Sequence, residues 1–370
     1  MFLFFYFFCY ITFNPKYPRR NHASIIDGFF LFFFGAYGLR LFWNIYVDGY
    51  EQLIFNNDLT CFIYMIFLCI IPYFTFRNIN WDIVNIKVVL KVLILIFLVG
   101  LLASFKTFIT GLMAGVVLYQ GRADANNYLD TIGYGHLALT FILACFCLLR
   151  LDKGLRFRWL YYIFMCFGLL SMGLANSRSP FLVLALLIGI SILHRISIIK
   201  VIISCILFFF VIVNLDRLND FFLEELNSPF IERTMAVFEI GMQDASNGRD
   251  VLFSDGLKIF KESPILGESI VLKDGEFRGS YVHNAIIEVL MGLGVIGGMV
   301  YSLINIIAFF ASIRLIMFDS KYMFFAFVFI QYFIFLQFSR SLLLLPLYWV
   351  SIASVYSCYT FEKKQLVISK

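Results

Sequence analysis

His283 is the residue of this sequence whose type and setting best fit acid–base chemistry. It ends the polar stretch Arg278-Gly-Ser-Tyr-Val-His283, and an apolar run begins at Ala285. An imidazole with an unperturbed pKa suits a general base near neutral pH. His136, by contrast, lies inside an apolar segment, where we expect a packing or hydrogen-bonding role. A single histidine at a helix start can also be purely structural, so both interpretations of His283 stay open.

Asn284 and Glu288 follow His283 directly, and both are predicted to serve the same site. Their spacing of four places them on one face of a helix. Glu288 lies about one turn into the apolar run, where an ionisable group needs a reason. We expect it to orient Asn284 or His283, or else to pair with an arginine.

Four arginines lie on the side of the chain that carries few positive charges. A guanidinium binds phosphate through two parallel hydrogen bonds, so these residues are candidates for anion recognition. The alternative is that outer loops tolerate some positive charge, with Arg249 pairing with Asp250 or Asp244. The four are Arg122, Arg178, Arg249 and Arg340.

Arg178 has the most informative setting of these arginines. It lies in Asn176-Ser177-Arg178-Ser179-Pro180, a break between two apolar segments that is short enough for only a tight turn. Ser179 suits a helix N-cap, and Pro180 suits the first helical position. An arginine beside a helix start is a suitable site for a lipid-linked phosphate or pyrophosphate. The alternative is a snorkelling arginine that caps a helical hairpin.

Other residue patterns that could carry chemistry are weak. No ligand spacing for a metal is present, so neither a metal nor a cofactor is expected. The eight cysteines all lie in apolar runs and read as small core residues. Gly292, Gly294, Gly297 and Gly298 follow no strand and lie inside an apolar segment, which favours close helix packing over nucleotide binding.

The composition indicates which elements must position these residues. The chain of 370 residues is 61% hydrophobic and 14% charged, far from the average of soluble proteins. This predicts an all-α polytopic membrane protein whose spans approach ~20 residues. Eleven apolar segments are predicted, at 1–13, 25–46, 59–75, 83–104, 131–149, 159–175, 180–194, 198–214, 284–312, 322–338 and 341–360.

Charge fixes the predicted orientation of these segments. From Asp216 to His283 there are 7 Lys and Arg against 13 Asp and Glu, a balance of −6, so the remainder of the +5 chain carries +11. Among the short loops, one side holds seventeen positive residues and the other holds four. Positive charge collects in the cytoplasm, which places the C-terminus inside and the long loop outside.

The long loop divides the chain into three predicted parts. About eight N-terminal membrane helices occupy 1–214, the external loop occupies 215–283, and about three C-terminal helices occupy 284–370. Within the loop, Asp250–Lys261 has the apolar pattern of a short amphipathic helix that Ser263-Pro264 stops. Gly267 and Asp274-Gly275 predict turns.

Several of these motifs, in this order, resemble the O-antigen ligase/polymerase superfamily. The resemblance covers about residues 115–300. It rests on Asn176-Ser-Arg178-Ser-Pro, Gly248-Arg249, Ser263-Pro-Ile-Leu-Gly267, and His283-Asn284-x-x-x-Glu288 with the glycines that follow. It implies about 11–12 transmembrane helices in a bacterial inner membrane, with one large periplasmic loop. By the same matching, Arg122 resembles a further arginine on the pyrophosphate side.

The resemblance also implies an activity, namely metal-independent glycosyl transfer from an undecaprenyl-pyrophosphate-linked glycan. The expected reaction is polymerisation of O-antigen or related surface polysaccharide repeat units. His283, Arg178 and Arg249 are the predicted catalytic residues, and Arg122, Asn284, Glu288, Ser177 and Ser179 the predicted substrate-binding residues. Membrane lipid and a chain-length regulator protein are expected partners, and nucleic acid is not. Two alternatives remain: a ligase that transfers polysaccharide to lipid A core, and a lipid-linked oligosaccharide flippase or transporter.

Overall fold

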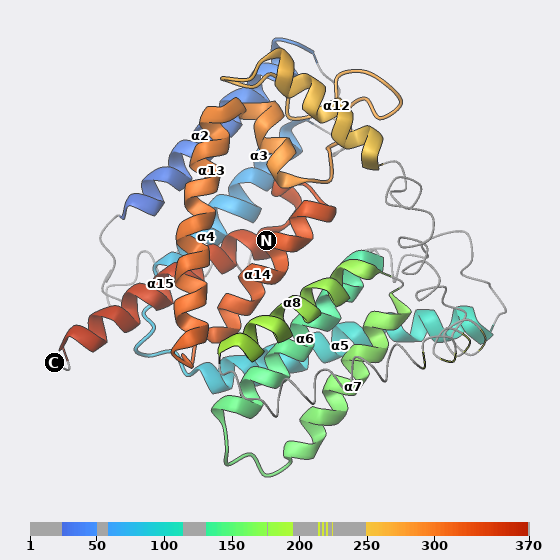
Figure 1. Ribbon diagram of the computed structural model, residues 1–370, viewed down its shortest axis with the longest axis vertical. Helices are drawn as coiled ribbons and strands as arrows, with labels where there is room; N and C mark the ends of the chain where they lie inside the picture. The colour runs from blue at the N-terminus through green and yellow to red at the C-terminus, as the bar shows by residue number, and fades with distance from the viewer. Residues whose placement is uncertain are drawn as a thin grey trace. The chain divides into compact units, whose positions relative to one another are not determined.

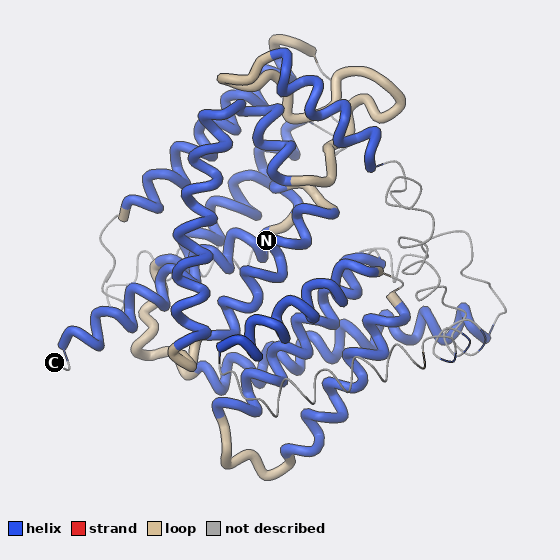
Figure 2. The backbone as a smooth tube through the Cα atoms, in the orientation of Figure 1, coloured by secondary structure: helices blue, strands red, loops and turns tan. Residues whose placement is uncertain are grey.

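The fold is known from a computed structural model. It describes residues 24–49, 58–113, 131–175, 177–194 and 249–368, together with the single positions 214, 217, 220 and 224. In these residues the regular secondary structure is helical, without a strand (Figure 2). The helices are α2 (Ile25–Tyr46), α3 (Asp58–Tyr64), η1 (Met65–Ile70), α4 (Ile71–Arg77), α5 (Ile86–Met113), α6 (Thr131–Leu151), α7 (Arg158–Leu174), α8 (Arg178–His194), α12 (Arg249–Glu262), α13 (Ala285–Met317), α14 (Met323–Phe338), η4 (Leu342–Leu344) and α15 (Pro346–Ile368).

Five helical stretches in the described part of the chain are long and apolar enough to cross a membrane. They are Ile25–Tyr46, Leu59–Arg77, Ile86–Ser104, Ile132–Leu151 and Ala285–Met317. The predicted apolar segments 1–13 and 198–214 lie outside the described residues. Each of the other predicted segments coincides with helix. The segment predicted from 341 begins as a helix only at Pro346, because η4 occupies its first turn.

The helices form two compact units, residues 1–84 with 246–370 and residues 85–245. The first unit joins α2, α3 and α4 from the start of the chain to α12, α13, α14 and α15 from its end. Within it, α13 packs against α2, α14 and α15 (Figure 1). The second unit contains α5, α6, α7 and α8, with α6 packed against the other three. Helices that are far apart in sequence therefore pack together within the first unit.

An aromatic cluster forms the core of the first unit. Phe30, Phe33, Phe34 and Tyr37 recur on α2 at intervals of three and four, so they share one face of the helix. All four are almost fully buried. The Phe34 ring lies edge-on to the ring of the buried Trp349 of α15, with ring centroids 4.8 Å apart. Rings packed in this way stabilise the contact by about 0.5–1.5 kcal/mol beyond their buried area.

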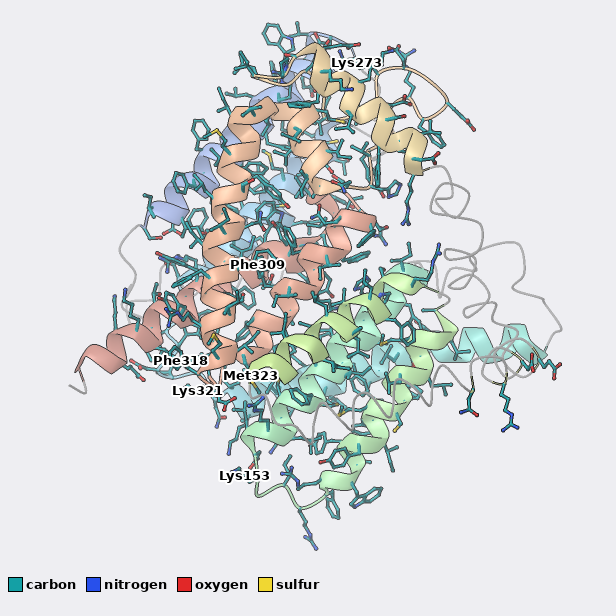
Figure 3. All side chains as sticks on the ribbon, in the orientation of Figure 1. Lys153, Lys273, Phe309, Phe318, Lys321 and Met323 are labelled. Carbon is teal, nitrogen blue, oxygen red and sulfur yellow. The ribbon has the colours of Figure 1, made fainter. Side chains whose placement is uncertain are left out.

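The first unit carries separate charged groups at the two ends of α13. Figure 3 labels Lys273 near α12 and Lys321 near the far end of α13. The Lys321 end holds a buried ion pair, in which Arg77 Nε lies 3.0 Å from the Asp27 carboxylate. Asp27 also accepts a hydrogen bond from the backbone N–H of Ser24, which caps the start of α2. The long polar connection containing Lys273 lies at the opposite end.

Close contacts at glycines hold the second unit together. A Cβ on Gly168 of α7 would come within 2.6 Å of Ile142 Cγ1 of α6. A Cβ on Gly135 of α6 would come within 2.9 Å of Pro180 Cγ of α8. Small residues at such positions let helix backbones approach closely, as is typical of membrane helices. This packing brings α6 directly against the turn between α7 and α8.

Candidate functional site

His283 occupies a strained position at the start of α13. Its φ of 57° lies in the left-handed region, which few residues other than glycine adopt. Val282 before it is fully buried, and Asn284 after it is the N-cap of α13. The imidazole lies against the Tyr281 ring, with centroids 4.3 Å apart, and its Nδ1 atom is buried. The residue as a whole is partly exposed.

The α12 helix packs over the start of α13 and brings Arg249 into the same unit. The predicted amphipathic helix is confirmed, with bounds Arg249–Glu262 and an end just before Ser263. Its buried residues Leu252 and Ile259 share a hydrophobic cluster with Val282, the neighbour of His283. A Cβ on Gly256 would lie 2.7 Å from Val282 Cγ1. Arg249 begins α12 two turns earlier, roughly 10 Å along the helix axis.

The loop after α12 inserts its backbone into a break in α13. Gly294 has φ 63° and ψ −161°, which interrupts the helical hydrogen bonds. The N–H of Val295 donates instead to Pro264 O at 2.8 Å, and Met291 O accepts from the N–H of Glu268 at 2.7 Å. We call residues 263–270 the inserted loop. The backbone groups at this break in an apolar helix thus bond to protein backbone.

Glycines of α13 and of the inserted loop make this insertion possible. A Cβ on Gly294 would lie 2.3 Å from Ile265 O, and a Cβ on Gly267 would lie 2.4 Å from the backbone of Gly292. The predicted close approach at Gly292 and Gly294 is therefore real. The expected partner is wrong, because both glycines meet the inserted loop and not another membrane helix. The predicted turns at Gly267 and Gly275 are confirmed, since both residues have positive φ.

Arg40 and Asn44 of α2 hold the inserted loop from the other side. The Arg40 guanidinium donates to the backbone oxygens of Leu266 and Gly267, each at 3.0 Å. The amide of the fully buried Asn44 donates to Glu268 O at 2.9 Å and accepts from the N–H of Ile270 at 3.2 Å. Sequence reasoning missed both residues. The sequence did contain a signal for them. Arg40 and Asn44 are four residues apart in an apolar span, where polar side chains need hydrogen-bond partners.

Acidic residues surround the ammonium group of Lys273, which follows the inserted loop. It forms an ion pair with Glu268. Burial lowers the pKa of Lys273, while the nearby carboxylates of Glu262 and Asp274 act in the opposite direction. The ion pair of Lys273 with Glu268 therefore holds the inserted loop to the residues that follow it.

Asn284 and Glu288 make contacts that the sequence did not predict. The Asn284 side chain accepts from Ile287 N at 3.0 Å and donates to Gln337 O of α14 at 3.1 Å. Glu288 is fully buried and accepts from Tyr37 Oη at 2.7 Å and Ser341 Oγ at 2.9 Å. The expectation that Glu288 orients Asn284 or His283, or pairs with an arginine, is wrong. Both residues instead tie α13 to neighbouring elements.

The second unit contains Arg178, at the first position of α8. The predicted tight turn is present, because α7 ends at Leu174 only a few residues earlier. Ser179 is not the N-cap, since α8 starts one residue before it and Pro180 stands third in the helix. Proline is tolerated there because N–H groups of the first turn have no partner within the helix. Arg178 is partly exposed.

Hydroxyl groups beside Arg178 bond within the protein. Ser179 Oγ lies 3.0 Å from Nε2 of the buried His136 and 3.4 Å from Ser177 Oγ. The hydrogen-bonding role predicted for His136 is confirmed. These contacts fix the turn against α6. Ser177 and Ser179 therefore have a structural role, and their substrate-binding role stays a prediction.

Two further predictions concern Arg122 and metal binding. Arg122 lies outside the described residues. In the part of the chain that the structure describes, no group of three or more His, Cys, Asp or Glu side chains could hold a metal ion. His283 and Arg249 lie in the same compact unit of the chain.

Comparisons with protein-family models, with curated proteins and with solved structures found no match.

Proposed function

We propose that this protein is a membrane-embedded glycosyltransferase that polymerises lipid-linked repeat units of O-antigen or a related surface polysaccharide. In this proposal, the chain has 11–12 transmembrane helices in a bacterial inner membrane. Its C-terminus lies in the cytoplasm, and residues 215–283 form a periplasmic loop. The donor is a glycan linked to undecaprenyl pyrophosphate, and the acceptor is a sugar hydroxyl of another lipid-linked unit.

The reaction forms one bond and breaks one bond at the anomeric carbon of the donor sugar. The acceptor oxygen attacks this carbon, and the bond to the phosphate oxygen breaks. Undecaprenyl pyrophosphate leaves with the electron pair, while the imidazole of His283 takes the proton of the acceptor hydroxyl. The resemblance assigns Arg178, Arg249 and Arg122 to binding of the pyrophosphate and to stabilisation of its growing negative charge.

The observation that carries this proposal is the backbone strain at His283. A histidine with φ 57° persists only where surrounding contacts fix it, and such residues cluster at functional sites. Buried Val282 and the N-cap Asn284 supply those contacts. The fixed imidazole lies at the start of a helix long and apolar enough to span a membrane, where a lipid-linked substrate would present its polar head.

The test is the lipopolysaccharide ladder of a strain that lacks this protein, complemented with variants. His283→Asn is the informative variant, because asparagine tolerates the left-handed conformation but supplies no base. We expect it to fail to restore long chains, with a loss of roughly 10²–10⁴ in rate. Asp319→Asn is the matched control, since Asp319 also has positive φ (52°) at the other end of α13. It should restore the full ladder.

The same ladder separates the alternatives. Loss of long chains with one repeat unit still on the core indicates a polymerase. Loss of all O-antigen from the core indicates a ligase, which uses the same donor chemistry with a different acceptor. Lipid-linked units that accumulate on the cytoplasmic face indicate a flippase. Restoration of the wild-type ladder by His283→Asn would remove the support for a catalytic histidine.

A further inference from the structure

Consecutive backbone carbonyl groups of the inserted loop, those of residues 264–268, all accept hydrogen bonds from protein donors. The N–H groups of the two residues after the break in α13 donate to the first two carbonyls, at 2.8 and 3.4 Å. The Arg40 guanidinium donates to the next two, at 3.0 Å each, and the Asn44 amide donates to the last, at 2.9 Å. A loop in water does not need protein donors for every carbonyl, because water supplies them, whereas a loop in hydrocarbon does.

The side chains at the tip of the same loop are large, apolar and exposed. Ile265 is 66% exposed and Leu266 is 61% exposed. Water gains nothing from contact with such side chains, whereas hydrocarbon accepts them without cost. The tip therefore combines carbonyls that are paired within the protein with side chains that suit an apolar environment.

The loop tip continues the exposed apolar surface of two neighbouring spans. The helices α2 and α13 pack against each other, and both are long and apolar enough to cross a membrane (Figure 1). The Ile265 carbonyl bonds to Ile296 of α13, whose side chain is exposed. The Leu266 carbonyl bonds to Arg40 of α2, which directly follows the exposed Leu39. The surface that α2 and α13 would present to lipid thus includes the tip of the loop.

Two aromatic side chains of α2 indicate how deep the loop lies. Trp43 and Tyr46 are exposed in the last turns of α2, and such residues collect at the boundary between membrane and water. Arg40 lies about one turn, roughly 5 Å, before Trp43 on the side of the span. Its guanidinium holds the Leu266 carbonyl, so the tip reaches the level at which the acyl chains begin.

We propose that the inserted loop is a shallow re-entrant element of the membrane domain, in which Ile265 and Leu266 contact the acyl chains of lipids in the leaflet nearest α12. Arg40 and Asn44 hold the loop there, because they supply the donors that water supplies to an ordinary loop. This inference requires only that α2 and α13 lie in a membrane, and it is independent of the proposed transfer reaction. It refines the proposed topology, since part of the segment 215–283 then enters the membrane.

The first test measures how often a spin label at Leu266→Cys collides with oxygen and with a water-soluble nickel chelate. The full-length protein without its native cysteines is placed in vesicles of phosphatidylethanolamine and phosphatidylglycerol. Oxygen concentrates among acyl chains, whereas the polar chelate stays in water. We expect frequent collisions with oxygen and few with the chelate, as for Leu39→Cys, an exposed position within the α2 span. Lys258→Cys, exposed on α12, is the aqueous control and should show the opposite pattern.

Either of two other patterns would overturn the lipid contact. Collisions of the Leu266 label with the chelate at the rate of the Lys258 label would place the tip in water. Few collisions with both reagents would mean that protein covers the tip.

Photo-cross-linking repeats the test with the native cysteines in place. A benzophenone amino acid that replaces Leu266 should form cross-links to phospholipid when intact cells are irradiated. The same amino acid in place of Lys258 should not. Cross-links from the Leu266 position to protein alone, whether within this chain or to a partner, would contradict the proposal.

Arg40→Ala tests the donor that holds the loop. Without the guanidinium, the Leu266 carbonyl loses the hydrogen bond from α2, and we expect the tip to leave the acyl chains. Collisions of the Leu266 label with the nickel chelate should then rise towards those of the Lys258 label. Arg314→Ala, at an exposed arginine near the other end of α13, is the control and should leave the label as it is. An unchanged label in Arg40→Ala would refute the role assigned to Arg40.

Discussion

At the scale of single residues, the predicted site residues differ in how the rest of the protein holds them. His283 and Arg340 have a positive φ. The side chains of Asn284 and Glu288 instead form hydrogen bonds that join α13 to neighbouring elements. Ser179 bonds to His136. The predicted substrate-binding roles of Asn284, Glu288 and Ser179 remain predictions beside these structural contacts.

Arg178 can be tested by a substitution that keeps its charge. Arg178→Lys should leave polymer formation low, because a pyrophosphate needs the planar guanidinium and lysine offers only a point charge. Arg178→Ala should lose about 10²–10³ in rate. Polymer length and rate in complemented cells are the measurements. Arg156→Lys, at an exposed position of the same unit, is the control and should have no effect. Full activity of Arg178→Lys would indicate a role in charge or topology only.

At the scale of elements, the inserted loop determines the shape of α13. The loop fills the break at Gly294 with its own backbone, and Arg40 and Asn44 of α2 fix it there. The break lies about ten residues after Asn284, so the first turns of α13 form a short separate segment. That segment carries Asn284 and Glu288 and positions His283.

Gly294→Ala tests this arrangement. An alanine there would place its Cβ 2.3 Å from Ile265 O and would require a left-handed backbone. We expect the seating of the loop to weaken by roughly 1–3 kcal/mol or more. Hydrogen exchange of residues 263–270 should become faster, and polymer formation should fall.

Gly35→Ala provides the matched control for this substitution. A Cβ at Gly35 of α2 would meet no atom within 4 Å. Alanine in a helix interior is favoured over glycine by about 0.5–1 kcal/mol. This variant should therefore leave the exchange of the loop and the polymer unchanged. Slow, wild-type exchange of the loop in Gly294→Ala would show that the insertion does not depend on the glycine.

At the scale of the whole molecule, the first and last parts of the chain fold together. Residues 1–84 and 246–370 form one unit, so α13 packs on α2 although more than two hundred residues separate them. The polar connection with Lys273 lies at one end of this unit and Lys321 at the other (Figure 3). If the unit spans a membrane, these ends face opposite compartments.

Cysteine labelling tests the orientation that the charge bias predicts. In a background without the eight native cysteines, Lys258→Cys on α12 should react with a membrane-impermeant thiol reagent added from outside. Lys321→Cys should react only after the membrane is permeabilised. Both positions are exposed in the structure, so burial cannot explain a missing reaction. Reversed labelling would overturn the functional proposal, because it requires the α12 end to be periplasmic.

The sequence by itself determined the helices, their turns and the class of protein. Apolar runs, Ser263-Pro264 and Gly275 act over a few residues, so their consequences can be read locally. Only the tertiary structure decided which side chains meet. Tyr37 and Glu288 are 251 residues apart, and Arg40 and Leu266 are 226 apart. The partner of a buried polar group depends on which helices pack together. The apolar periodicity is nearly the same in every span, so it does not determine which helices become neighbours.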